Sequence, residues 1–450
     1  MYEHLQAYLS QGIYPFHMPG HKRNPMFIPQ GLADLDITEI PGMDILRTPT
    51  GILHDLQCAI ADFYRADKSY LLVNGSTAGI VTAICATTAE GDKLYAARNG
   101  HVSMYSGMAL SGVLPIYMHP EITAGGLAGG INPEAFDDIE EGTTTIIASP
   151  TYEGFVSDIK AIADKVHDRG GILIVDEAHG AHFSFNSAFP ESALDLGADI
   201  VVQSFHKTLP ALGQLAVLHV KGSRVDTTRL QFFVNAMQTT SPSYMLMGQL
   251  SYALNMLWKR PELFDMYVNR LTALRKALTA NETLPIALIG QELIGKHAIH
   301  NMDCGKLLFR LNTHENAEDI LATLADKYRV QPEMAAGRHL LAMTSVADTD
   351  EGMQRLWAAI GALNIRLEVK IHATPQIGYA TPYPTPEQVF TPRQATQQET
   401  ESIPWETAPG RIAGEVVAAY PPGIALVAPG ERIPQDLPQL ASHVCVLKEG

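Results

Sequence analysis

The stretch VVQSFHKTLP, residues 201–210, places polar and charged side chains directly after an apolar run. The run at 200–202 continues into Gln203 and Ser204, and Phe205, His206 and Lys207 follow. A second apolar run, 215–220, begins soon afterwards. Lysine is rarely buried unless it is paired or used, so Lys207 is either a surface residue of a hairpin or a functional amine at a strand end.

Similar apolar runs recur along the first half of the chain and alternate with helical patterns. One such pattern, SDIKAIADKVHDRGG, has helical spacing of its apolar residues and ends at a glycine pair. Continuous apolar strands that alternate with helices predict an α/β fold with a mostly parallel sheet covered on both faces. The last two strands are joined too tightly for a helical crossover and are expected to be antiparallel. The seven predicted strands are 69–75, 93–98, 113–118, 144–150, 171–178, 199–204 and 215–220.

A chain of 450 residues is too long for one ordinary core, so at least two domains are expected. We predict an N-terminal arm over 1–45, a large domain over 46–290 and a C-terminal part over 291–450. In that C-terminal part, 306–311 and 339–346 are typical of strands. Residues 373–410 are rich in proline, threonine and glutamine and predict an irregular connection.

Composition excludes several classes of protein. The formal charge of −16 argues against a nucleic-acid partner. The most apolar window, 71–89, is interrupted by polar residues and glycines, which argues against a membrane span. The four cysteines form no CxxC pair, the HxxH pairs lack further ligands, and the start resembles no signal peptide, so we expect no metal and a cytoplasmic location.

Candidate site residues follow the carboxyl ends of the predicted strands, where open α/β sheets bind ligands. Ser76 and Thr77 open a helix and can bind a phosphate, although both residue types are also common helix N-caps. Asp176 ends an apolar strand and needs a cationic partner. Together with Lys207, these groups fit pyridoxal phosphate (PLP), which offers a phosphate, a protonated ring nitrogen and a carbonyl. The order of the motifs is typical of the aspartate-aminotransferase-like fold, PLP fold type I.

Six motifs then carry a more specific resemblance. The chain resembles the bacterial Orn/Lys/Arg decarboxylases, in their compact form without an N-terminal wing domain, over nearly its whole length. The motifs are FHMPGHK (16–22), LVNGSTAG (72–79), DEAHGAHF (176–183), QSFHKTLPAL (203–212), QTTSPSY (238–244) and YPPGIALVAPGE (420–431).

The resemblance implies decarboxylation of arginine, lysine or ornithine to agmatine, cadaverine or putrescine with release of CO2. Lys207 would bond to the cofactor, and Asp176 would face its ring nitrogen. The remaining implied cofactor contacts are His101 and Ala178 on the two ring faces, His179 nearby, and Ser76, Thr77, Ser204 and His206 at the phosphate. The site would lie at a homodimer interface, with Thr240 reaching the phosphate of the partner subunit.

Other features leave alternatives open. Glu333, Glu415 and Glu431 are candidates to bind the distal cation of the substrate, although a carboxylate of this kind is more often a surface or structural residue. The chain departs from the family at Phe205 and Val102, which could reshape the pocket. Two other functions remain possible. Transamination or elimination could use Arg411 to hold the α-carboxylate, and a non-catalytic regulator could bind PLP without reacting.

Overall fold

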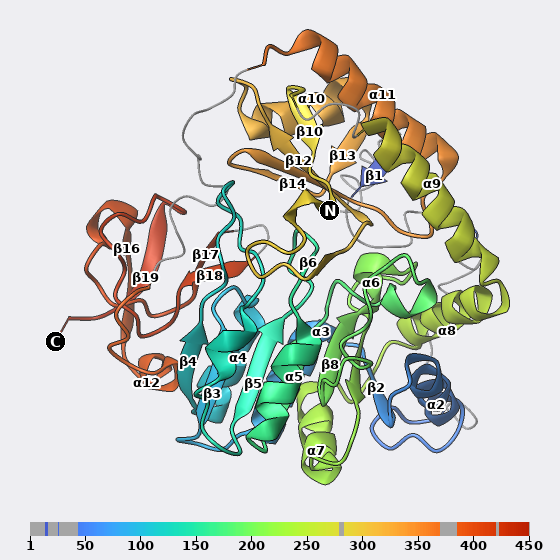
Figure 1. Ribbon diagram of the computed structural model, residues 1–450. Helices are drawn as coiled ribbons and strands as arrows, with labels where there is room; N and C mark the ends of the chain where they lie inside the picture. Colours follow the sequence, from blue (N-terminus) through green and yellow to red (C-terminus); the bar gives the residue numbers. More distant parts are fainter. Residues whose placement is uncertain are drawn as a thin grey trace.

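The computed structural model describes residues 14–16, 26, 44–278, 283–369, 385–419 and 423–449. Its largest sheet has seven strands in the order β2-β9-β8-β7-β5-β3-β4 (Figure 1). All seven strands that the sequence predicts are present within a few residues of the predicted bounds. They are β2 (Lys68–Leu72), β3 (Lys93–Ala97), β4 (Leu114–Met118), β5 (Thr144–Ala148), β7 (Ile172–Asp176), β8 (Ile200–Ser204) and β9 (Ala216–Val220).

The sheet is mostly parallel, as predicted. Strand β9 runs antiparallel to both of its neighbours, β8 and β2, with Ser204 opposite Ala216. The remaining neighbours, from β8 through β7, β5 and β3 to β4, are parallel. Strands β2, β3, β5, β7 and β8 therefore point their carboxyl ends toward the same edge of the sheet, and the candidate residues follow those ends.

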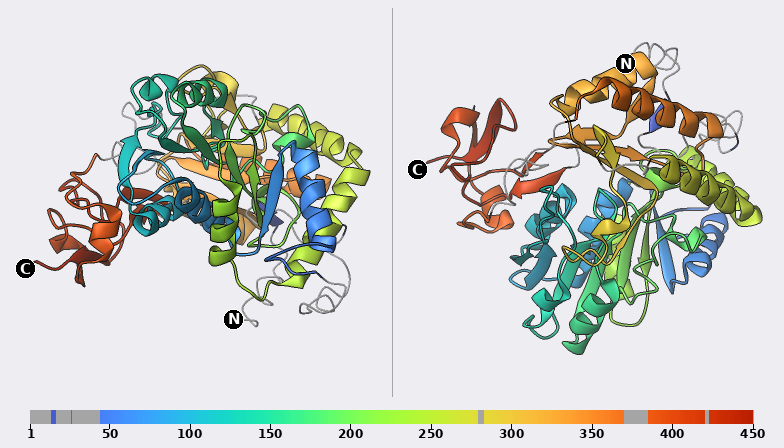
Figure 2. Two further views of the ribbon diagram at one scale, coloured as in Figure 1. Left: turned by 90° about the horizontal axis from the view of Figure 1, so that it is seen from below. Right: turned by 45° about the horizontal axis from the view of Figure 1, so that its top comes forward.

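Helices cover both faces of this sheet because successive strand residues point to opposite faces. Ile174 packs into one core cluster with α3 (Gly75–Thr87), α4 (Val102–Ser111) and α7 (Thr227–Met237). Its neighbour Val175 packs into another with α2 (Ile52–Tyr64), α5 (Ile159–Asp168), α8 (Tyr244–Lys259) and α9 (Glu262–Leu278). The left view of Figure 2 shows helices on both sides of the strands.

A smaller α/β unit lies beyond the carboxyl edge of the sheet (Figure 1). Its antiparallel sheet has the order β10-β12-β15-β14, and its helices α10 and α11 pack on the strands. The bounds are β10 (Ile286–Leu288), β12 (Lys306–Leu311), α10 (Ala317–Tyr328), β13 (Val330–Pro332), β14 (Met334–Ala336), β15 (His339–Met343) and α11 (Asp350–Arg366). The short strands β6 (Phe155–Val156) and β11 (Asn301–Met302) pair between the two units.

Of the expected N-terminal arm, the structure describes residues 14–16, Met26 and the last two residues, 44 and 45. Strand β1 (Tyr14–Phe16) pairs in parallel with β13. The rest of the FHMPGHK motif lies outside the described residues. The backbone of the arm therefore joins the smaller unit next to Glu333, which follows β13.

The expected irregular connection of residues 373–410 contains regular structure in its described part. Thr391 and Gln394 form a capping box that begins α12 (Pro392–Thr396). Strand β16 (Thr400–Pro404) pairs with β19 (His443–Leu447) at the end of the chain. Strands β17 (Val417–Ala419) and β18 (Ile424–Val427) form a second pair in this C-terminal part. Local patterning missed β16 because its partner lies far away in sequence.

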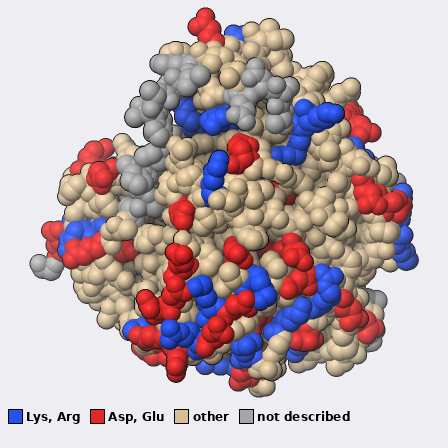
Figure 3. All heavy atoms as spheres, in the orientation of Figure 1, with Lys and Arg blue, Asp and Glu red and all other residues tan. Residues whose placement is uncertain are grey.

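The described surface carries side chains of both charges, and the net charge of the chain is −16. Figure 3 shows acidic and basic side chains interspersed over the lower half of one face. Within the described ranges, no helix is both long and apolar enough to cross a membrane. The same residues bring together no group of three potential metal ligands from histidine, cysteine, aspartate and glutamate.

Candidate active site

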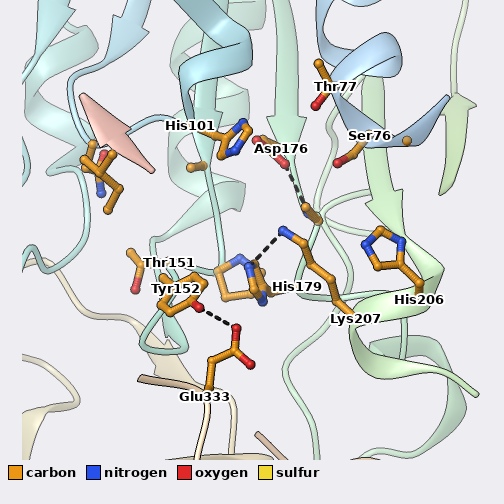
Figure 4. Close-up of a pocket in the computed structure, with 16 residues that line it drawn as sticks. Ser76, Thr77, His101, Thr151, Tyr152, Asp176, His179, His206, Lys207 and Glu333 are labelled. Carbon is orange, nitrogen blue, oxygen red and sulfur yellow. Dashed lines mark hydrogen bonds between the residues drawn. The ribbon is translucent and has the colours of Figure 1, made fainter. Parts of the chain in front are cut away.

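A cavity of about 350 Å³ opens at the carboxyl edge of the large sheet. Figure 4 shows that its walls come from the loops after the parallel strands and, on the far side, from Glu333 of the smaller unit. The lining residues include eight of the sequence-predicted cofactor residues: Ser76, Thr77, His101, Asp176, Ala178, His179, His206 and Lys207. The fold therefore gathers these dispersed motifs around one space.

Lys207 reaches the cavity from α6 (Phe205–Thr208), a single helical turn that begins directly after β8. The turn is held to β9 because the carbonyl of Leu215 accepts the Phe205 N–H at 3.0 Å and lies 2.9 Å from His206 Nδ1. Burial lowers the pKa of Lys207, which favours its neutral amine. Lys207 is thus an amine at a strand end that lines the cavity, and not an exposed hairpin residue.

Phe205 points away from the cavity. Its side chain is fully buried, and its ring centroid lies 5.6 Å from that of Tyr64. Val102, at the start of α4, is also absent from the cavity lining. Neither of these two departures from the family therefore lines the described cavity, and Phe205 belongs to the core; their effect on the shape of the pocket stays a prediction.

The amino end of α3 forms one end of the cavity. Ser76 and Thr77 lie in the first turn, and the N-cap residue Asn74 makes no side-chain capping hydrogen bond. The interpretation of Ser76 and Thr77 as N-caps is therefore wrong. Ser204 is fully buried and donates to Ser76 Oγ at 2.8 Å, so it stands behind Ser76 in the wall. Backbone N–H groups and hydroxyls at this helix end fit an anion.

Asp176 and His101 line the middle of the cavity. Burial raises the pKa of Asp176, while the charge of Lys207 and the Ala178 N–H, 3.2 Å from Oδ1, oppose that rise. His101 begins α4, and its Nδ1 accepts the Ser103 N–H at 3.2 Å. Burial lowers the pKa of His101 to about 4, so its ring is neutral at neutral pH. A neutral ring can stack on a flat ligand without adding charge.

His179 lies between two lysines. Its Nε2 is 3.1 Å from Lys207 Nζ, and its Nδ1 is 2.7 Å from Lys306 Nζ. Lys306 is the first residue of β12, so this contact joins the loop after β7 to the smaller unit. Lys306 was not predictable as a site residue, because a lysine at the start of a strand carries no local signal of burial.

The cavity wall of the smaller unit carries Glu333. The hydroxyl of Tyr152 donates to its Oε1 at 2.6 Å, and Figure 4 shows the pair opposite Ser76 and Thr77. Tyr152, Thr151 and Asn99 also line the cavity, and none of the three was predicted from the sequence. Asn99 is buried, and its Oδ1 has no hydrogen-bond partner among the described residues. A buried amide oxygen without a partner next to a cavity points to a ligand.

The other two candidate carboxylates lie elsewhere. Glu431 is buried and pairs with Arg98 at 2.7 Å, and Glu415 is exposed; neither lines the cavity. Arg411, the candidate carboxylate clamp of a transaminase, pairs with Glu401 at 2.7 Å and Glu449 at 2.9 Å, also away from the cavity. The expectation that Glu431 binds the substrate is wrong in this subunit, because its carboxylate is already matched to a buried guanidinium.

Thr240 is exposed and outside this cavity, at the surface after α7. The structure holds a single chain, so the expected contact of Thr240 with a partner subunit stays a prediction.

The cavity fits PLP by the chemistry of its walls. Hydroxyl and N–H donors lie at the α3 end, and the buried carboxylate of Asp176 lies in the middle. The amine of Lys207, whose pKa is lowered, lines the same cavity. The unpartnered Asn99 Oδ1 marks an additional polar contact to be filled. These are the groups that a phosphate, a protonated ring nitrogen and a carbonyl require.

Comparison with known proteins agrees with this geometry. Residues 1–332 match the family described as Orn/Lys/Arg decarboxylase, major domain, and residues 377–450 match its C-terminal domain. An arginine decarboxylase of Bacillus anthracis is 31% identical over 438 residues, which cover 94% of this chain and 88% of the relative. Three further Bacillus and Halalkalibacterium relatives with that name are 30–31% identical.

Solved structures share the fold. The constitutive lysine decarboxylase of Escherichia coli has a TM-score of 0.77 at 18% identity, covering 99% of this chain and 81% of that one. A structure described as SPT with PLP has a TM-score of 0.57 at 15% identity and covers 79% of this chain and 87% of that one. The fold is therefore PLP fold type I, as predicted. With both family models matched, this chain belongs to the Orn/Lys/Arg decarboxylase family and is a decarboxylase of basic amino acids.

Proposed function

We propose that this chain converts arginine to agmatine and CO2 with PLP bound at Lys207. The bond between the α-carbon and the carboxylate breaks, CO2 leaves, and one proton takes its place on the α-carbon. The observation that carries the proposal is that Lys207, Asp176 and the α3 end line one cavity. The choice of arginine rests on the relatives of about 30% identity that carry that name.

Each cofactor contact follows from the chemistry of the wall. Ser76, Thr77 and the first N–H groups of α3 would bind the phosphate, with Ser204 supporting Ser76 from behind. Asp176 would face the ring nitrogen, and His101 and Ala178 would cover the two ring faces. PLP, when bound, supplies a carbonyl for the substrate amine and an electron sink for the bonding pair that CO2 leaves behind.

The protein groups then control protons and charge. Asp176 must be anionic to keep a ring nitrogen protonated, and the hydrogen bond from the Ala178 N–H opposes the effect of burial on its pKa. Lys207 must be neutral to act as a nucleophile, and burial favours that form. Neutral His101 and His206, with pKa values lowered to about 4, avoid adding positive charge near the lysine.

Glu333 would bind the distal guanidinium of arginine. It is the lining carboxylate that lies opposite the phosphate end, and Tyr152 orients it through the 2.6 Å hydrogen bond. A guanidinium prefers a planar, oriented carboxylate, and a fixed glutamate offers one. Because Glu333 follows β13, the substrate side chain would extend from the large sheet toward the smaller unit.

We also propose a homodimer in the cytoplasm, with Thr240 of each subunit directed to the phosphate site of the other. The exposed position of Thr240 on this chain is compatible with that contact. Sedimentation of the purified protein, together with loss of PLP affinity in Thr240→Val, would test the arrangement. A monomer that binds PLP with full affinity would contradict it.

The experiment that tests the proposed function is a product-amine screen with purified, PLP-supplemented protein. L-arginine should give agmatine, and Lys207→Ala should reduce the rate to background, a loss of about 10³-fold or more. The surface variant Lys160→Ala should keep the wild-type rate. If lysine gives cadaverine, or ornithine gives putrescine, with a higher kcat/KM than that of agmatine formation from arginine, that amino acid is the preferred substrate and the choice of arginine is wrong. A keto acid without an amine product would contradict decarboxylation.

A further inference from the structure

The two lysines around His179 raise a question about protons. His179 and Lys306 are 6% and 4% exposed, so water does not mediate either contact from bulk solvent. Lys207 Nζ faces Nε2 at 3.1 Å, and Lys306 Nζ faces Nδ1 at 2.7 Å. Both ring nitrogens are therefore within hydrogen-bond distance of an amine.

Hydrogen-bond valence limits the charge on these amines. A neutral imidazole has one N–H and one acceptor nitrogen, whereas an ammonium group can only donate. If both lysines were charged, one ammonium would face an N–H, and one of the two short contacts would be repulsive. A protonated His179 is also excluded at neutral pH, because burial and the two lysines lower its pKa well below the ordinary value. One lysine must therefore be neutral and accept a hydrogen bond.

The shorter contact favours Lys306 as the charged partner. Charge-assisted hydrogen bonds are shorter than neutral ones, and the Lys306 contact is the 2.7 Å one. We propose that Lys306 is a positioning residue whose ammonium donates to His179 Nδ1, so that His179 carries its proton on Nε2 and donates it to a neutral Lys207 amine. This inference rests on the proposed function, in which the Lys207 amine must be neutral to bond to the cofactor.

The charges around the three groups limit them to a single shared positive charge. Burial lowers the pKa of Lys207, and the larger lowering is that of Lys306, to about 7, with a charge on Lys207 among its causes. These shifts alone would place the charge on Lys207, whereas the 2.7 Å contact with His179 Nδ1 places it on Lys306; the labelling experiment decides between the two. The carboxylates whose charge raises the pKa of Lys306 are Asp303, Glu333 and Glu153. Those that raise the pKa of Lys207 are Asp176 and Glu333. Besides the two lysines, His101 and His206 lower the pKa of His179.

The loop after β5 is shaped around Lys306. Gly154 has a φ of +97°, and a Cβ there would lie 2.7 Å from Lys306 Cγ, so a side chain would collide with the lysine stem. The Lys306 ammonium lies 5.5 Å from the centre of the Tyr152 ring, within the range of a cation–π contact. Asp303, on the other side, accepts the Gly305 N–H at 2.8 Å and lies 3.1 Å from His182 Nε2. The Lys306 N–H donates to the carbonyl of Asp303 at 3.2 Å, so this turn fixes the backbone of Lys306.

The test measures the protonation of Lys207 in protein without PLP. Acetic anhydride labels neutral amines, so labelling of Lys207 across a pH series, quantified by mass spectrometry, gives its pKa. Lys306→Met keeps the length of the side chain and removes the charge. His179 could then accept from a Lys207 ammonium, so the pKa of Lys207 should rise by about one unit or more. Lys306→Arg should restore a lowered pKa, and the surface variant Lys160→Met should leave it unchanged.

An unchanged Lys207 pKa in folded Lys306→Met would overturn the inference. If that variant does not fold, ¹⁵N spectra of histidine-labelled wild-type protein provide the second test, with His179→Gln used to assign the signals. A proton on Nε2 of His179 supports the inference, and a proton on Nδ1 contradicts it. Because neither measurement uses PLP or substrate, a failure of arginine decarboxylation can be told apart from a failure of this arrangement.

Discussion

Arg98 and Glu431 form a buried ion pair at 2.7 Å, with side chains 1% and 2% exposed. Arg98 comes after β3 and Glu431 after β18, so the pair joins the C-terminal part to the large sheet. Arg98 also donates to the carbonyl of Leu426 at 2.8 Å, and Glu431 accepts the Ala428 N–H at 2.7 Å. Because both partners are buried and make further hydrogen bonds, we infer that this pair stabilises the fold and does not bind substrate.

Glu431→Ala should therefore act on stability. Removing one partner leaves Arg98 as an uncompensated buried charge, which costs about 3–5 kcal/mol of unfolding free energy. Urea unfolding measures this loss, and the exposed control Glu415→Ala should stay within about 0.5 kcal/mol of wild type. A Glu431→Ala variant with wild-type stability and a raised KM for arginine would instead show that Glu431 contributes to substrate binding.

Glu333→Gln should weaken substrate binding. A hydrogen bond to a charged group contributes about 1.5–3 kcal/mol, so the KM for arginine should rise at least about tenfold. Tyr152→Phe removes the donor at 2.6 Å but keeps the carboxylate, so its effect should be smaller. Steady-state kinetics on both variants give the comparison. Equal KM values in wild type and Glu333→Gln would show that the distal cation binds elsewhere.

Gly79→Ala should destabilise the helix that carries Ser76 and Thr77. A Cβ at this position would lie 2.7 Å from Leu72 Cδ1 and 2.8 Å from Val202 Cγ1 in the packed sheet. Overpacking of this kind costs about 1–3 kcal/mol. The matched control is Gly361→Ala in α11, where a Cβ meets no atom within 4 Å; it should stabilise by about 0.5–1 kcal/mol. Thermal or urea unfolding distinguishes destabilisation by Gly79→Ala from stabilisation by Gly361→Ala. An unchanged unfolding free energy in Gly79→Ala would show that the helix can shift to make room for the Cβ.

His219 should contribute to acid sensitivity of the fold. It is fully buried, lies 2.8 Å from Ser69 Oγ and 3.2 Å from Gln203 Oε1, and burial lowers its pKa to about 3. The unfolded chain, with a histidine pKa near 6.5, binds this proton more readily, so stability falls as the pH drops below about 6.5.

The corresponding variant is His219→Asn, with the exposed His54→Asn as control. Between about pH 6 and 4, removal of this histidine should reduce the slope of unfolding free energy against pH by up to about 1.4 kcal/mol per pH unit. Urea unfolding at several pH values measures the slope. If the slope of unfolding free energy against pH is the same in His219→Asn and wild type, proton uptake by His219 on unfolding does not cause the acid sensitivity.

The sequence predicted the large sheet well because its strands carry continuous apolar runs and its ligands follow strand ends. Ser76, His101, Asp176 and Lys207 were predictable for that reason. The contacts of Tyr152, Lys306 and Glu431 were not, since they depend on how the smaller unit and the C-terminal part meet the sheet. Phe205 looked like a pocket residue by position, but the helical turn of α6 directs it into the core while Lys207 faces the cavity.

We propose that a basic amino acid loses its α-carboxylate at Lys207. The most direct test is release of labelled CO2 from carboxyl-labelled L-arginine by the PLP-loaded protein, measured together with agmatine in the same reaction. We predict equal amounts of the two products in wild type and neither in Lys207→Ala. Consumption of arginine without labelled CO2, or labelled CO2 that persists in Lys207→Ala, would contradict the account.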